Sequence, residues 1–116
     1  MITNKTKNKI LVDKHINCNT YLQKTMGLMF RKFIGIIFTN KKEMLILLHM
    51  LYVFYPIDVI LLDSKKRVVE LKSNFKPFTF WMPKEKSKYI LEIRNNKIKE
   101  TDTEIGDTVI FSDSTN

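Results

Sequence analysis

Two ionisable side chains, His49 and Asp58, lie inside the longest apolar stretch of the sequence, Met44 to Leu62. An ionisable group among apolar residues must be paired, neutral or functional, because burial of an unpaired charge is costly. If strands on either side of Pro56 flank one site, Asp58 could accept a hydrogen bond from the His49 ring and orient it as a general base. The structural alternative satisfies His49 with a backbone carbonyl and uses Asp58 to cap the turn after Pro56. We favour the structural role, because a base also needs a nucleophile or a cofactor beside it.

Three further residues complete the candidate ligand-binding set: Arg31, Lys76 and Trp81. The guanidinium of Arg31 could bind a carboxylate or phosphate with two parallel donors, or it could simply stabilise the negative end of a helix. Lys76 and Trp81 belong to the aromatic segment Phe75 to Pro83, whose rings could stack on bases or cover a ligand groove. The alternative, which we favour, is that these rings plug one end of a small barrel.

Metal and catalytic signatures are weak in this sequence. His15 and Cys18 are spaced like a ligand pair but have no second pair, so we expect no metal site. We find no glycine-rich phosphate loop, no Gly-x-Ser-x-Gly elbow and no His-Glu-x-x-His string. The sequence therefore favours a small ligand-binding or accessory module without catalysis and without a cofactor, acting on an unknown small ligand or protein partner. An enzyme that uses His49 as base and Asp58 as its orienter is the first alternative.

The composition describes one small globular domain. The chain has 116 residues, 44% of them hydrophobic, and a formal net charge of +8. We expect a single domain over residues 9–111 with flexible tails at 1–8 and 112–116. One cysteine excludes an intramolecular disulfide, and the amino terminus lacks the apolar core of a signal peptide, so we expect a cytoplasmic protein.

The basic charge suggests nucleic-acid binding as a second alternative. Lysine and arginine number 20 against 12 acidic residues, which is the type of excess that phosphate-binding proteins show. The basic residues are mostly lysine in a chain rich in lysine, isoleucine and asparagine, and compositional bias produces such a charge in any protein. We therefore do not favour this function from sequence.

The apolar stretch 44–62 is long enough to span a membrane, but it contains His49, Pro56 and Asp58. Its β-branched and aromatic residues favour two buried strands joined by a turn, and we expect no membrane span. Further strands are predicted at 9–16, 35–38, 67–72, 89–93 and 107–111, with a polar turn at 39–43 that joins 35–38 to 44–52 as a hairpin.

One helix is predicted before these strands. Apolar residues recur at helical spacing between Leu22 and Phe33, and Thr20 with Gln23 is typical of a helix start. The connections between the strands are too short for crossover helices. The sequence therefore predicts an α+β fold, with a mainly antiparallel, curved or barrel-like sheet and one amphipathic N-terminal helix.

The order of several short motifs resembles the family catalogued as domain of unknown function 192. The resemblance covers roughly residues 10–111 and rests on Gly27-Leu28-Met29-Phe30-Arg31, the run from His49 to Ile60, Asp63, Val68-Val69, Lys76-Pro77, the run from Lys88 to Glu92, and Ile105-Gly106-Asp107. It implies a compact, largely β domain with one helix, found in bacteria and archaea, and it implies no established activity.

The chain is similar to the archaeal type of this family, because His49-Met50 and an aromatic-aliphatic run precede Pro56-Ile57-Asp58. It lacks the Trp-Met-Lys-Asn string and the export signal of bacterial relatives. It also lacks two glycines that the family usually has. Lys66 occupies the hairpin after Asp63, which predicts a different or a strained turn, and Arg94-Asn95-Asn96 follows the Leu-Glu strand without a glycine.

Overall fold

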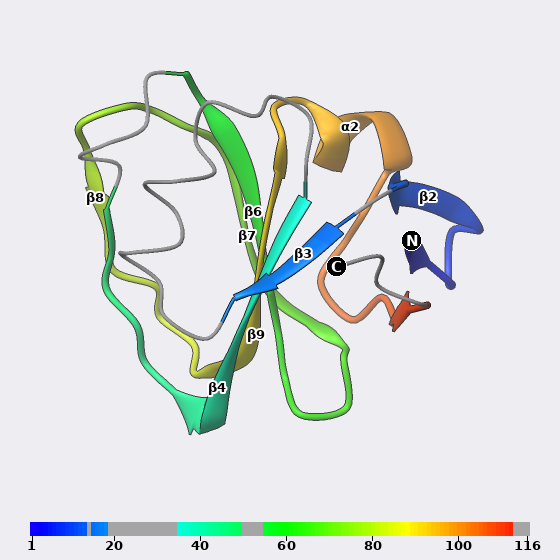
Figure 1. The fold of residues 1–116 in the computed structure, drawn as a ribbon, viewed down its shortest axis with the longest axis horizontal. Coiled ribbons are helices and arrows are strands. Elements are labelled where there is room, and N and C mark those ends of the chain that lie inside the picture. The colour runs from blue at the N-terminus through cyan, green and yellow to red at the C-terminus, as the bar shows by residue number, and fades with distance from the viewer. Residues whose placement is uncertain (14, 19–34, 50–54, 113–116) are drawn as a thin grey trace.

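The computed structural model describes residues 1–13, 15–18, 35–49 and 55–112, and gives the backbone alone for 15–18, 48 and 49. The described elements are strands and one short helix. They are β1 (Ile2–Asn4), β2 (Lys9–Val12), β3 (His15–Cys18), β4 (Gly35–Met44), β5 (Leu48–His49), β6 (Ile57–Leu62), β7 (Val68–Phe75), β8 (Phe80–Trp81), β9 (Ser87–Arg94), α2 (Lys97–Thr101) and β10 (Val109–Phe111). Figure 1 shows β3, β4, β6, β7 and β9 crossing at the centre of the molecule, with β8 at one edge and β2 and α2 towards the other.

The main sheet has five strands in the order β3-β4-β9-β6-β7. Strand β3 runs parallel to β4, and the other neighbours are antiparallel. Every residue of β6 is buried, which is why its sequence is an unbroken apolar run apart from Asp58. The predicted mainly antiparallel sheet is confirmed. The sheet is open, with β3 and β7 at its edges, so the expected closure towards a barrel was wrong.

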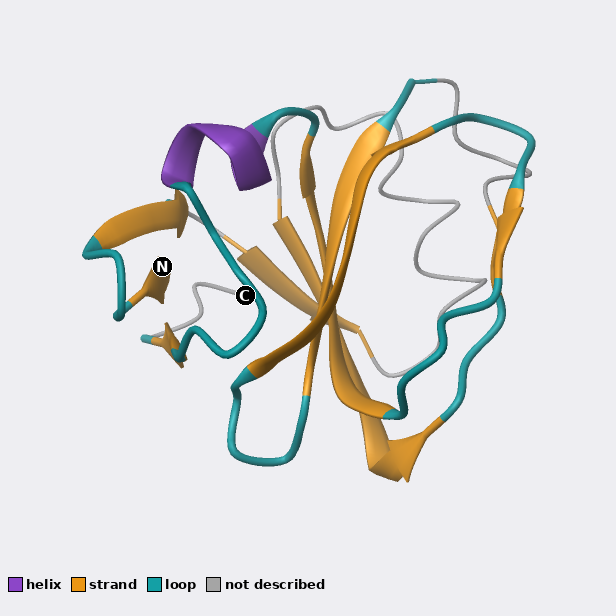
Figure 2. Cartoon of the chain, turned by 180° about the vertical axis from the view of Figure 1, so that it is seen from behind, coloured by secondary structure: helices purple, strands orange, loops and turns teal. Residues whose placement is uncertain are grey.

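The two faces of the main sheet carry separate cores. On one face, residues of β4, β6 and β9 pack with Phe75, and Ile46, Tyr55, Val69 and Trp81 lie against them. We call this the ribbon-side core, because it lies under the two-stranded ribbon of β5 and β8. The other face packs against α2 and the small sheet β10-β1-β2, and we call this the amino-terminal core. Figure 2 shows the small sheet and the ribbon on opposite sides of the main sheet.

Residues 1–8 do not form the tail that we expected. Strand β1 is the centre of the small sheet, pairing with β2 on one side and β10 on the other. Ile2 and Asn4 are both fully buried. The sequence did not predict β1, because three residues are too few to show the alternation of a strand. The lysines and asparagines around them are typical of a solvent-exposed terminus.

The predicted amphipathic helix falls on residues 19–34, which lie outside the described residues. Among those that the structure describes, α2 is the one helix, and the sequence did not predict it. The predicted hairpin between 35–38 and 44–52 was also wrong. Residues 39–43 continue β4 up to Met44, β4 pairs with β9, and β5 pairs with β8 instead.

The long apolar stretch contributes strands β5 and β6, and residues 50–54 within it are outside the described part. Within the described residues, no helix has the length and hydropathy needed to cross a bilayer.

Both positions where the family glycines are missing have left-handed backbone. Lys66 has φ 62° in the β6–β7 hairpin, so the expectation of a strained turn there is confirmed. Its backbone N–H donates to the Asp63 carbonyl, and its ammonium lies 4.9 Å from the Phe111 ring and 5.6 Å from the Tyr89 ring. These cation–π contacts offset part of the backbone cost.

Asn96, with φ 74°, forms the second such turn and precedes α2 without a side-chain cap. We expect Asn96→Ala to lower the free energy of unfolding by about 1 kcal/mol, because a Cβ-bearing residue without the local hydrogen bonding of asparagine tolerates this conformation less well. Asn96→Gly should leave it unchanged or raise it. Urea denaturation of the two variants checks this. Equal losses in both would show that the side chain of Asn96, and not its backbone conformation, matters.

Candidate functional site

Asp58 is fully buried in β6, and both of its carboxylate oxygens accept hydrogen bonds from the backbone. The Asn74 N–H donates to Oδ1 at 3.0 Å, and the Ile98 N–H donates to Oδ2 at 2.9 Å. Asn74 is itself in the left-handed region with φ 54°, and Ile98 is in the first turn of α2. Asp58 therefore fixes a strand irregularity and caps a helix that has no cap of its own.

The structure places Asp58 on the face of the main sheet opposite the ribbon. Its neighbours Ile57 and Val59 belong to the ribbon-side core, whereas Ile60 and Ile98 belong to the amino-terminal core. His49 pairs through its backbone with Phe80 in the ribbon. The structure thus does not bring Asp58 to the strand that carries His49. The carboxylate accepts hydrogen bonds from Asn74 and Ile98 and not from the turn after Pro56, where we had expected a capping role. Arg31 lies outside the described residues.

Lys76 and Trp81 lie in the connection between β7 and β9, as the sequence predicted. Trp81 packs edge-on against Phe75, with ring centroids 6.1 Å apart, and the Lys72 ammonium lies 5.9 Å from the Trp81 ring. The Lys76 carbonyl accepts a hydrogen bond from the Thr79 hydroxyl, which holds the turn before β8. The inner side of the ribbon is therefore part of the core.

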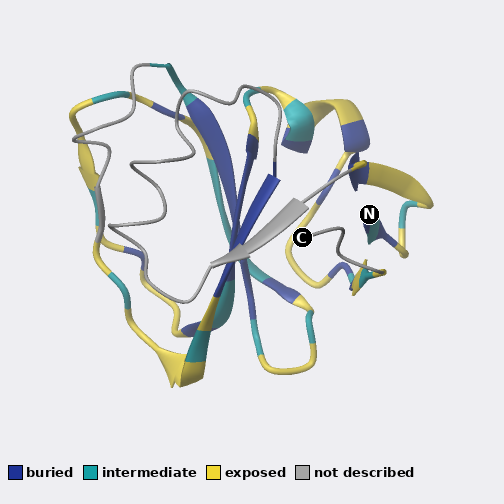
Figure 3. Cartoon of the chain, in the orientation of Figure 1, coloured by how far each residue is buried: buried dark blue, intermediate teal, exposed yellow. Residues whose placement is uncertain are grey.

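The outer side of the ribbon is apolar as well. Five side chains on and beside β5 and β8 are 49 to 61% exposed, and we call them the outer ribbon face: Leu45, Leu47, Phe78, Phe80 and Met82. Phe80 and Met82 lie on either side of Trp81, which packs inward, as expected of an extended strand, and Phe78 lies in the turn before β8. Figure 3 shows this exposed stretch at the edge of the molecule, away from the buried strands of the main sheet. Apolar patches of this kind mark interaction sites.

Phe78 is the least expected member of the outer ribbon face. Its φ is 61°, a conformation that is rare for a bulky residue, and its side chain is 59% exposed. Backbone strain and an exposed aromatic ring both cost folding free energy. Such costs gather at functional sites, where the strained residue has a second role.

Glu92 is a buried acidic residue that the sequence pattern did not single out as a candidate. Glu92 is 5% exposed in β9, opposite Ile36 on one side and Val59 on the other, so it belongs to the face of the ribbon-side core. The signal that could have found it was the alternation of β9, which places Glu92 on the same face as the buried Ile90. Burial raises the pKa of Tyr55 above its ordinary value of 10.0, and the negative charge of Glu92 raises it further.

We expect Glu92→Gln to lower the pKa of Tyr55 while leaving it above its ordinary value, because burial is the larger cause. Because that pKa exceeds the unfolded value of about 10, the folded protein holds a proton that the unfolded chain loses, and stability falls as the pH rises beyond about 10. Ultraviolet titration of the tyrosines checks this, with Tyr55→Phe identifying the Tyr55 step. If the pKa of Tyr55 is the same in Glu92→Gln as in the parent chain, the charge of Glu92 does not raise it.

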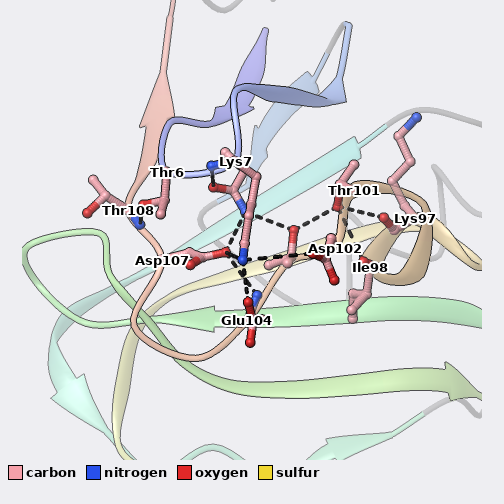
Figure 4. Close-up of polar contacts among 11 residues, drawn as sticks. Thr6, Lys7, Lys97, Ile98, Thr101, Asp102, Glu104, Asp107 and Thr108 are labelled. Carbon is pink, nitrogen blue, oxygen red and sulfur yellow. Dashed lines mark hydrogen bonds and ion pairs between the residues drawn. The ribbon is translucent and has the colours of Figure 1, made fainter.

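A second polar cluster ties the amino-terminal sheet to the segment after α2 (Figure 4). The Asn4 amide donates to Asp107 Oδ2 at 3.0 Å and to the Thr103 hydroxyl at 2.9 Å. The Glu104 N–H also donates to Asp107 Oδ2. Lys7 forms an ion pair with Glu104. Asn4, Thr103 and Asp107 are all at least 95% buried, so this cluster stabilises the fold and presents no open site.

The basic residues gather at the end of the molecule where β4, the β6–β7 hairpin and the start of β9 meet: Lys41, Lys42, Lys65, Arg67, Lys84, Lys86 and Lys88. A hollow of about 570 Å³ lies among Glu43, Leu45, Asp63, Arg67, Val69 and the segment 84–86. We call this region the basic end.

Three of the acidic residues at the basic end accept hydrogen bonds within the chain. Two hydrogen bonds from Ser64 lower the pKa of Glu43. Burial acts to raise the pKa of Asp63, but bonds from the N–H groups of Arg67 and Lys65 and from the Arg67 guanidinium outweigh it and lower that pKa. Glu70 accepts from the N–H groups of Lys84 and Glu85. These carboxylates stay ionised, so the basic end has seven basic side chains against four acidic ones when Glu85 is included.

Among the described residues, no group of three or more histidine, cysteine, aspartate or glutamate side chains is arranged to hold a metal ion. His15 and Cys18 lie in β3, of which the structure describes the backbone alone.

Relatives of known sequence align with nearly the whole chain. A UPF0127 protein of Thermococcus sibiricus is 33% identical over 113 residues, which are 94% of this chain and 73% of the relative. A UPF0127 protein of Pyrococcus furiosus is 36% identical over 107 residues, which are 90% of this chain and 91% of the relative. The family pattern of DUF192, described as "Uncharacterized ACR", matches residues 2–111. The resemblance seen in the sequence motifs is confirmed.

Two solved structures are similar in fold. A protein of unknown function from Novosphingobium aromaticivorans superposes with a TM-score of 0.73 at 23% identity, over 84% of this chain and 74% of that chain. A protein from Sinorhizobium meliloti described as a "putative transcription regulator" gives 0.73 at 20% identity, over 83% of this chain and 79% of that chain. Identities this low show a shared fold and nothing more.

Proposed function

Since the chain belongs to the DUF192 family, which is described as uncharacterised, we propose a function from its surface: a non-catalytic binding module that engages a macromolecular partner through the outer ribbon face. The observation that carries this proposal is the ribbon itself. Its inner side packs on the ribbon-side core, and its outer side exposes Leu45, Leu47, Phe78, Phe80 and Met82. A two-stranded ribbon with apolar side chains on both sides needs a second surface to cover it.

The geometry of Asp58 supports a role without catalysis. Its two oxygens accept hydrogen bonds from the N–H groups of Asn74 and Ile98 on the face of the main sheet opposite the ribbon. From that face the carboxylate cannot orient His49 as a base. We further propose that the protein works in the cytoplasm, where its single cysteine is stable as a thiol.

Site-directed crosslinking tests the binding face. A photoreactive amino acid at Phe80 should give a discrete adduct in intact cells, identified by mass spectrometry as protein or lipid. The same amino acid at Ile105, which is 67% exposed on the far side of the main sheet, should not. Met82→Glu should remove the Phe80 adduct. Equal adducts at both positions, or none at Phe80, would show that the outer ribbon face is not a binding face.

A second candidate function is nucleic-acid binding at the basic end. The observation that favours it is the excess of basic side chains there, seven against the four acidic residues Glu43, Asp63, Glu70 and Glu85. Binding of unrelated oligonucleotides should weaken with added salt, because phosphate contacts release counterions.

Charge reversals locate the nucleic-acid contact. Lys41→Glu and Lys86→Glu should each weaken oligonucleotide binding, whereas Lys99→Glu, on α2 far from the basic end, should not. No binding at low salt, or binding that does not respond to salt, eliminates this function.

A further inference from the structure

We propose that the partner of the outer ribbon face is an anionic lipid surface. This inference rests on the proposed binding role of the ribbon and names its partner. The first observation is the charge of the segments that form the ribbon. Residues 72–84 contain three lysines and no acidic residue, and residues 44–49 contain no lysine, arginine or acidic residue. The outer ribbon face is therefore apolar. Lys76 lies at one margin, and at the other margin Lys84 lies with Glu43 and Glu85 around a hollow that Leu45 also lines.

The second observation is the form of the ribbon. Phe80 and Met82 stand two residues apart at β8, Phe78 lies in the turn just before it, and Leu47 and Leu45 precede the strand that pairs with β8. The ribbon lies at the edge of the molecule, on the side opposite the small amino-terminal sheet (Figure 1). Exposed aromatic and aliphatic side chains at such an edge can enter the headgroup region of a membrane.

The margins of the ribbon suit this environment. Lys76 is exposed at one end of the segment and Lys84 at the other. Lysine stems can lie along the apolar region while their ammonium groups reach anionic headgroups, which attract them. Aromatic side chains partition to the same interfacial layer.

The charges also argue against a second copy of the chain as the partner. A symmetric dimer through the outer ribbon face would place Lys72 and Lys76 of both copies at one interface, and the segment 72–84 has no acidic residue to pair with them. An anionic surface meets these lysines with the opposite charge. The strained, exposed Phe78 also fits a role in insertion, because its ring is presented to the partner at a cost to the fold.

Vesicle binding by the full chain tests the inference. The vesicles contain phosphatidylcholine alone or a mixture with phosphatidylglycerol, and binding is read by co-sedimentation. We expect binding to the mixed vesicles that weakens with salt, and little binding to phosphatidylcholine alone.

Matched variants separate the ribbon from the rest of the surface. Phe78→Ser and Phe80→Ser should each weaken binding about tenfold or more, as should Lys76→Glu, in proportion to the apolar area and the charge removed. Ile105→Ser and Lys99→Glu make the same kinds of change away from the ribbon and should leave binding unchanged. Circular dichroism of each variant confirms that the fold is retained, as expected from the exposure of these residues.

Three outcomes overturn the lipid inference: equal binding to neutral vesicles, binding that the ribbon variants do not weaken, and no vesicle binding at all. If a dimer seen by light scattering is lost in Phe80→Ser, the partner is a second copy instead. A protein adduct at Phe80 without vesicle binding overturns the lipid partner and leaves the proposed binding role standing. The absence of any adduct at Phe80 overturns both.

Discussion

Asp58→Ala should lower the free energy of unfolding by about 3 to 5 kcal/mol, the largest loss that we expect from a single polar substitution. The substitution leaves the N–H groups of Asn74 and Ile98 without their acceptor. Both lie at places where the backbone has no local alternative, one at a left-handed residue and the other at a helix start that lacks a side-chain cap. Urea denaturation followed by far-ultraviolet circular dichroism measures the loss.

Asp58→Asn is the matched control, because it keeps one oxygen acceptor and the shape of the side chain. We expect it to be intermediate in stability, which keeps the test informative even if Asp58→Ala does not fold. If both variants retain the stability of the parent chain, the carboxylate does not hold α2 and the β7 irregularity, and its burial must have another explanation.

Asp107→Ala should be the second largest loss, about 2 to 4 kcal/mol, because Asp107 joins two parts of the chain that are far apart in sequence. It is 5% exposed and accepts from the Asn4 amide and the Glu104 N–H. The buried Asn4 amide would lose one of its two acceptors. The same denaturation experiment measures this, and loss of hydrogen-exchange protection in β1 and β10 should accompany it.

Glu104→Ala is the control for Asp107→Ala, because Glu104 belongs to the same cluster and its side chain is 65% exposed. Its ion pair with Lys7 is at the surface, so we expect little change in stability. Similar losses in Glu104→Ala and Asp107→Ala would mean that the surface ion pair, and not the buried hydrogen bonds, stabilises the segment.

Strands with a clear burial pattern were predicted well. Strands β6, β7, β9 and β10 lie where apolar runs or alternation placed them. The second half of β4 was mistaken for a turn. Its residues 41–44 are all exposed, so they show no alternation of apolar and polar side chains that would predict a strand. The pairing partners were harder to predict. Strand β5 pairs with β8 some thirty residues later, and residue types near β5 do not encode that choice.

For the candidate site, too, the local requirement could be predicted and the distant partners could not. The sequence correctly indicated that Asp58 must have partners, because an ionisable group in an apolar run has to be satisfied. It could not indicate which partners, since the N–H groups of Asn74 and Ile98 are 16 and 40 residues away. Lys76 and Trp81 were chosen for their aromatic surroundings, and the structure adds the exposure of Phe78, Phe80 and Met82, which the composition of the segment alone does not reveal.

The position of β1 between β2 and β10 has a consequence for biosynthesis. Ile2 is made more than a hundred residues before its neighbour Phe111. Until β10 is made, the amino-terminal core is therefore incomplete, and the second face of the central strands has only part of its cover. Nascent chains that stop before Val109 should be readily cleaved by proteases and bound by chaperones, and the synthesis of β10 should coincide with the closure of this core.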